Sequence, residues 1–138
     1  DPVSGGSEGE IRQQVETARD IARDIDAVVD MVNTLEIVRG QAATIKASLG
    51  DDSTMADVRV RADSLDKAMR AVEELLVQLR VTGRGQDLVR YPFRLSEQLI
   101  YLGQSVTSSD FAPTEPQRQV QAAAEREQLR AVIHSHVR

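Results

Sequence analysis

The sequence predicts an all-α fold, a four-helix bundle made of a long antiparallel helix hairpin and two shorter helices. Apolar residues recur at alternating steps of three and four positions along most of the chain, which is the seven-residue repeat of packed helices. Segments rich in Gly, Pro, Ser and Asp interrupt the repeat at 50–54, 82–87 and 107–113. Of the 138 residues, 41% are hydrophobic but only 3% are aromatic, so one domain with an aliphatic core is expected. Residues 1–8 are predicted to be a linker, and residues 9–138 the helical bundle domain.

The first helix is expected to run from about Glu10 to Leu49. Two apolar rows lie side by side along it: Ile11, Val15, Ala18, Ala22, Ile25, Val29 and Val32 in the first, and Ile21, Ile25, Val28, Val32 and Leu35 in the second. Two rows make a face wider than a two-stranded seam, so this helix needs more than one neighbour. After the second row the repeat shifts to Val38, close to Gly40, which predicts a bend or a change of register there.

The second helix is expected to follow directly on the segment GDDST at 50–54. Gly50 suits the left-handed cap of the first helix, and Thr54 with Asp57 resembles a capping box for the second. The apolar row of the second helix is Met55, Val58, Ala62, Leu65, Met69, Val72, Leu76 and Leu79. We expect the middle of this row to be buried, namely Leu65, Met69, Val72 and Leu76. So short a connection makes the two helices antiparallel neighbours.

Two shorter helices should lie along the open side of this hairpin. Glycines in 82–87 end the second helix, and Pro92 suits the first turn of the third. The apolar stripe of the third helix is Leu95, Leu99, Leu102 and Val106. Thr114 with Gln117 forms a capping box for a fourth helix, which is expected to reach about Val137 with an alanine-rich face.

All four aromatic residues of the chain lie between positions 90 and 116, and they are the candidate site residues: Tyr91, Phe93, Tyr101 and Phe111. Three of them flank the ends of the short third helix, where large apolar side chains could close a bundle built from small aliphatic ones. We therefore expect Phe93 and Phe111 to close the bundle. The alternative is that these aromatics dock another domain.

The sequence carries no recognisable motif for reaction chemistry. The chain has no cysteine, and its only histidines, His134 and His136, lie two apart on a helix and so face different ways. Neither belongs to the Glu-x-x-His pairs of di-iron bundles. We therefore assign no catalytic residue, no cofactor and no metal. The net charge of −5, with both signs mixed, argues against nucleic acid as a partner, and no apolar run approaches a membrane span.

The chain resembles the C-terminal helical region of bacterial sortilin-like proteins, whose β-propellers carry Asp-box (bacterial neuraminidase) repeats. The resemblance is carried by Asp1 and Pro2, by LEIVRGQ at 35–41 and above all by residues 73–120. Within the last segment, the similar features are a "QD" before a proline-started helix, the helix "RLSEQL" and the loop "SSDFAPT". Such proteins are classed as glycosyl hydrolases, but the Asp-box needs a tryptophan and this chain has none.

The resemblance implies a non-catalytic accessory or interaction domain of a large secreted or cell-envelope protein, whose propeller would be its partner. Self-association is a second expected contact. Two other functions stay open at this point. The bundle could be an independent sensor or scaffold domain. It could also be a small all-α enzyme that binds a dicarboxylate with core arginines, for which Arg39 and Arg59 are candidates because each interrupts or borders an apolar row.

Overall fold

A computed structural model describes residues 5–81 and 87–136, including all their side chains except those of Leu88 and residues 129–136. The elements are, in chain order, α1 (Glu8–Ser48), the 3-10 turn η1 (Ser53–Met55), α2 (Ala56–Leu76), α3 (Asp87–Arg90), α4 (Leu95–Thr107) and α5 (Glu115–His136). The described residues contain helices and loops and no strand, which confirms the all-α fold class.

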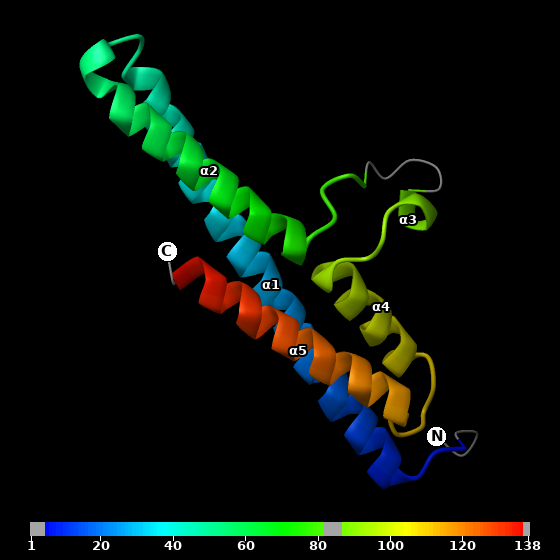
Figure 1. Cartoon of the computed structure of the whole chain (residues 1–138). Coiled ribbons are helices and arrows are strands. Elements are labelled where there is room, and N and C mark those ends of the chain that lie inside the picture. The colour runs from blue at the N-terminus through cyan, green and yellow to red at the C-terminus, as the bar shows by residue number, and fades with distance from the viewer. Residues whose placement is uncertain (1–4, 82–86, 137–138) are drawn as a thin grey trace.

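Helix α1 is the spine of the molecule, and the other helices divide its length between them (Figure 1). Helix α2 runs back antiparallel along the C-terminal half of α1, as the short connection predicts. Helix α4 lies along the N-terminal half, and α5 packs on α4, α2 and α1. The far part of the hairpin, residues 36–71, therefore consists of α1, η1 and α2 alone (Figure 1). We call this part the arm; the shorter helices do not cover it.

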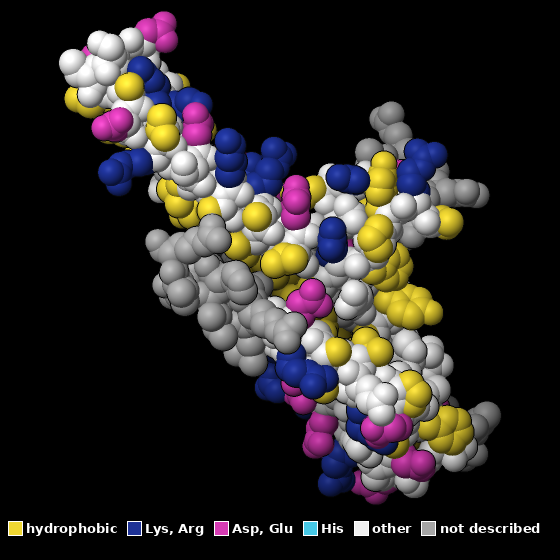
Figure 2. Space-filling view, in the orientation of Figure 1, with side chains coloured by type: hydrophobic (Ala, Val, Ile, Leu, Met, Phe, Trp, Pro, Cys, Tyr) yellow, Lys and Arg dark blue, Asp and Glu magenta, His cyan; other side chains and the backbone are white. Residues whose placement is uncertain are grey.

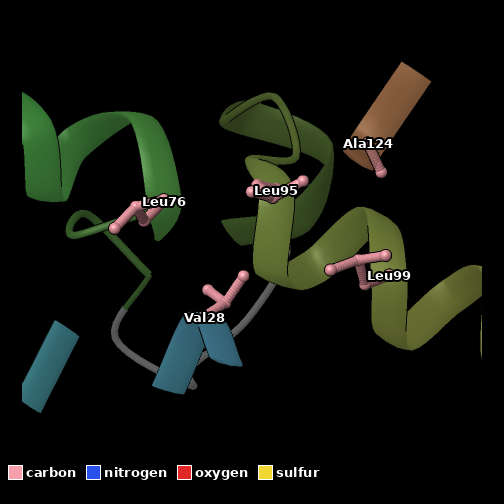
Figure 3. Packing of buried hydrophobic residues seen from close by; sticks show 5 residues of the cluster. All are labelled: Val28, Leu76, Leu95, Leu99 and Ala124. Atoms are coloured by element: carbon pink, nitrogen blue, oxygen red, sulfur yellow. The ribbon is translucent and has the colours of Figure 1, made fainter. Parts of the chain in front are cut away.

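The core lies where four helices meet. One cluster of buried residues takes one or two side chains from each of α1, α2, α4 and α5: Val28, Leu76, Leu95, Leu99 and Ala124 (Figure 3). A second cluster, Ile21, Leu102 and Val106, continues it toward the start of α1. The apolar stripe predicted for the third helix is thus fully buried. The small side chain of Ala124 lets α5 approach this core closely, in line with the alanine-rich face.

The buried row of α1 differs from the first row expected from the sequence. The fully buried apolar residues Ile21 and Val28 belong to the second row, whereas Val15 and Val29 of the first row are exposed. Buried residues keep a strict seven-residue spacing through Gln14, Ile21, Val28 and Ala42, with half-buried Leu35 in step. The predicted change of register near Gly40 is therefore wrong, and α1 continues as one helix to Ser48.

The turn between α1 and α2 is built by Asp52 and not by Thr54. Gly50 has a φ of 53° and so adopts the expected left-handed conformation. The Asp52 carboxylate accepts hydrogen bonds from the amide and the hydroxyl of Thr54, at 2.9 and 2.8 Å. Thr54 thus lies inside η1, and the capping box predicted with Asp57 does not form. Arg59 closes the turn by donating to the carbonyls of Gly50 and Asp52, at 2.8 Å each.

Helix α2 ends earlier than its apolar row suggests. The row reaches Leu79, but the helix stops at Leu76 and Val77 is extended. The chain turns there because Gln78 is held by the first turn of α4 and by the segment before it. Its backbone amide donates to Glu97 at 3.2 Å, and its side chain donates to the carbonyl of Pro92 at 2.9 Å. Pro92 lies ahead of the N-cap of α4, so its predicted place in a first helical turn is wrong. The short helix α3 was not predicted.

The two remaining helix starts are capped by side chains. One half of the predicted capping box of the last helix is shown, because the amide of Thr114 donates to Oε1 of Gln117 at 2.8 Å. Ser7, in the predicted linker 1–8, forms a second capping box with Glu10 and begins α1 at Glu8. The side chains of Leu129, Val132 and Ile133 lie outside the described residues. Within the described ranges, no helix is long and apolar enough to cross a membrane.

The expected burial of the second helix holds only at its base. Leu76 is 1% exposed and Val72 and Met69 are half-buried, but Leu65 is 43% exposed. Leu65 lies on the arm, where no third helix covers the hairpin, so the expectation for this residue is wrong.

We expect Leu76→Ala to lower the free energy of unfolding by roughly 2–5 kcal/mol, because it leaves a cavity among four helices. Leu65→Ala is the matched control on the same helix. It should lower the free energy by only about 1 kcal/mol, because that side chain is already partly in water. Urea denaturation of both variants checks the contrast. Equal losses at the two positions would contradict the described core.

Candidate interaction groove between α4 and α5

The four aromatic residues do not form one cluster. The rings of Phe93 and Tyr101 meet edge to face, with centroids 6.2 Å apart and planes at 61°. Tyr91 instead lies under the guanidinium of Arg80, at 5.8 Å from the ring centroid. Phe111 is 52% exposed and lies against Gly5, just ahead of α1. The structure therefore brings together Phe93 and Tyr101 and leaves Phe111 as a surface residue, so Phe111 does not close the bundle as expected.

An open groove of about 200 Å³ runs between α4 and the start of α5. Eight residues line it: Phe93, Gln98, Tyr101, Leu102, Ser105, Pro116, Gln117 and Val120. Leu102, which is buried, is part of the core below the groove, whereas Tyr101 is 65% exposed. Hydrophobic side chains gather over α3, α4 and the loop that leads to α5, on the right of Figure 2. The groove thus has the buried side chain of Leu102 at its floor and exposed apolar side chains at its rim.

The walls of the groove are uncharged and mostly apolar. None of the eight lining residues is Asp, Glu, Lys, Arg or His. Two of its polar groups bind each other, because the Gln117 amide donates to the Ser105 hydroxyl at 2.8 Å. The Gln98 amide donates to the Phe93 carbonyl at 3.4 Å. The groove therefore offers no acid, base or nucleophile pair, and it is suited to an apolar side chain.

Polar side chains hold α4 at both ends. At its C-terminal end, the buried amide of Gln14 on α1 donates to the carbonyls of Val106, at 3.0 Å, and Ser109. At its N-terminal end, Glu97 accepts from the amides of Gln78 and Arg94, at 3.2 and 2.8 Å. The Val106 carbonyl and the Arg94 amide are among the groups that a helix leaves unpaired at its ends. Helix α4 is thus held at its two ends by the side chains of Gln14 and Glu97.

Sequence reasoning missed Gln14, although a signal was present. It lies seven residues before Ile21, in register with the buried row of α1. A polar residue at a buried position of a helix needs a hydrogen-bond partner, and the nearest free acceptors are at the end of a packed helix. A glutamine within an apolar row therefore predicts a buried hydrogen bond, which in this fold goes to the C-terminal end of α4.

Arg39 and Arg59, the candidates for a dicarboxylate site, already bind groups of this chain. Arg39 pairs with Asp66, at 2.8 Å, and with the buried carboxylate of Glu73. The hydrogen bond from Arg39 lowers the pKa of Asp66, and the same bond raises the pKa of Arg39. Arg59 is held by the turn at Gly50. Neither arginine lines the groove.

The carboxylate of Asp24 on α1 destabilises the packing of α5 when it is ionised. Burial raises the pKa of Asp24 on α1 above its ordinary value, and the carboxylates of Glu125 on α5 and Asp20 raise it further. Because the pKa is higher in the folded state, protonation of Asp24 stabilises the fold, and this stabilisation is lost as the pH rises through that pKa. At neutral pH the ionised side chain therefore weakens the contact between α1 and α5.

No metal site is present among the residues that the structure describes: no three His, Cys, Asp or Glu side chains lie close enough to hold an ion. The side chains of His134 and His136 fall outside that part of the chain. Comparison of the chain with protein-family models, with curated proteins and with solved structures finds no match. The groove itself is therefore the basis for the proposal below.

If glutamine fastens α4, Gln14→Ala should destabilise the protein more than Phe111→Ala does. The first change leaves two carbonyls without their partner, which costs about 1–3 kcal/mol. The second removes a mostly exposed ring and should cost about 0.5 kcal/mol. Chemical denaturation of the two variants gives the comparison. A loss of roughly 3 kcal/mol for Phe111→Ala would restore Phe111 as the residue that closes the bundle.

Proposed function

We propose that this chain is a non-catalytic interaction domain that binds another protein through the groove between α4 and α5. The observation that carries the proposal is the exposed ring of Tyr101 beside an uncharged, apolar groove. Aromatic side chains are enriched in protein–protein interfaces, and charged residues are depleted at interface centres. Residues that bind most strongly at interfaces fill well-packed pockets. An apolar side chain of a partner, inserted beside Tyr101, would be such a residue.

The size of the groove favours a protein over a small molecule. Small-molecule sites usually enclose about 300–1,000 Å³ and bury most of their ligand. This groove has about 200 Å³ and is open to solvent. It offers room for one side chain of a larger surface. The fastening of α4 at both ends also supports this function, because a pre-formed groove spares the partner the cost of ordering it.

The proposed partner is the β-propeller of a secreted or cell-envelope parent protein. This step rests on the resemblance to the helical region of sortilin-like proteins alone. The groove has no charged lining residue, so the proposed contact on the propeller is an apolar side chain on a loop. The domain would then anchor or space the propeller, and any sugar site would lie outside this chain.

Selection of peptides that bind the chain tests the groove without knowledge of the partner. We expect enriched peptides to share one large apolar residue, and to lose at least tenfold in affinity against Tyr101→Ala and Val120→Glu. Ile100→Ala is the matched control, because Ile100 is an exposed apolar neighbour that does not line the groove. Peptides that bind all four proteins equally, or a selection that enriches nothing, would contradict this function.

A further inference from the structure

The arm and the adjoining base of the hairpin carry a repeated pair in which an apolar residue comes directly before a charged one. The five pairs are Val38–Arg39, Ile45–Lys46, Val58–Arg59, Leu65–Asp66 and Val72–Glu73. They recur every seven residues within each helix. Neighbouring residues of a helix point about 100° apart, so the two members of each pair face different sides of the hairpin.

The charged members lie on one flank of the hairpin. Across the two helices, Arg39 binds Asp66 and Glu73, and Lys46 binds Asp63. Moving back by one residue turns the side-chain direction by about 100° in each helix. Because the two helices are antiparallel, this turn leads in both of them from the charged flank to the opposite flank of the hairpin. The apolar members therefore lie together on the other flank. On the arm they are Val38, Ile45, Val58 and Leu65, which we call the arm strip.

The arm strip is open to solvent. Ile45, Val58 and Leu65 are exposed, and Val38 is half-buried. Figure 1 shows no other helix along the arm, and α5 ends beside its base. Isolated apolar residues on a surface need no explanation, but a row at seven-residue spacing on two adjacent helices is the pattern of a helix interface.

We propose that the arm strip is the contact surface between two copies of this chain. The strip itself carries no charge, although the whole chain has a net charge of −5. The charged residues next to it, Arg61 one turn before Leu65 and Asp57 one turn before that, have opposite signs. A copy of the same surface therefore meets no net repulsion. Two arms related by a two-fold axis form a four-helix bundle, a closed arrangement that uses the same residues on both sides.

The size of the arm predicts a weak dimer. Its α2 part is roughly 23 Å long at 1.5 Å per residue, and two helices about 9 Å apart are on the order of 20 Å wide. The two copies would together bury on the order of 900 Å², below the roughly 1,200 Å² of stable complexes and within the range of transient ones. The dimer should therefore form at high concentration and dissociate on dilution. This contact is independent of the groove between α4 and α5.

Sedimentation velocity of the whole chain over a wide range of concentrations tests the proposal. We expect the wild-type chain to dimerise, and Leu65→Glu and Ile45→Glu each to weaken the dimer at least tenfold. Val60→Glu is the matched control: Val60 is 63% exposed on the same helix, but lies on its outer side. Circular dichroism establishes that each variant is folded. A chain that stays monomeric at every concentration overturns the proposal and leaves the strip to a different protein. A dimer that survives Leu65→Glu overturns it too.

Disulfide trapping gives a second measurement, because the chain has no cysteine of its own. Leu65 belongs to the arm strip and would face the second copy, whereas Val60 lies on the outer side of the same helix. Leu65→Cys should therefore form a disulfide-linked dimer under mild oxidation, and Val60→Cys should not. Equal cross-linking of the two variants, or faster cross-linking of Val60→Cys, contradicts the arm strip.

Discussion

The ion pair between Arg39 and Glu73 is the contact on which the arrangement of the helices depends. Glu73 is only 2% exposed, and a buried carboxylate without a cation is strongly unfavourable. Arg39 reaches Glu73 and Asp66 together in one relative placement of α1 and α2. Without the short turn at Gly50, the apolar repeat alone would allow α2 to slide by a heptad along α1 and still bury its leucines. The charges therefore act together with that turn to select the register that the apolar pattern leaves open.

Two surfaces follow from that register. Toward the base of the hairpin, it places Leu76 in the core and Gln78 beside Pro92 and Glu97, and these contacts position the start of α4. The far end of α4 is held by Gln14, and the groove beside Tyr101 results. Toward the tip of the hairpin, the ion pairs of Arg39 with Asp66 and of Lys46 with Asp63 occupy one flank of the arm and leave the arm strip on the other. The groove between α4 and α5 and the arm strip thus both depend on how α1 and α2 are paired.

Local patterns predicted the fold well, and tertiary contacts account for most of the errors. The hairpin, the stripe of α4, the conformation of Gly50 and the cap at Thr114 follow from short-range rules, and the structure has all of them. The early end of α2 and the exposure of Leu65 depend instead on where α4 and α5 lie, which periodicity does not show. The groove was missed for the same reason: Tyr101 was identified, but its neighbours Gln117 and Val120 come from another helix.

A double-mutant cycle at Arg39 and Glu73 tests the central claim most directly. Arg39→Met leaves a buried carboxylate unpaired, so we expect the free energy of unfolding to fall by roughly 3–5 kcal/mol. Combining it with Glu73→Leu should recover much of this loss and give a coupling energy of about 1–3 kcal/mol. Chemical denaturation of the wild type, the two single variants and the double variant supplies the four values. Small and additive effects at the two positions would contradict the claim that this pair sets the register of the hairpin.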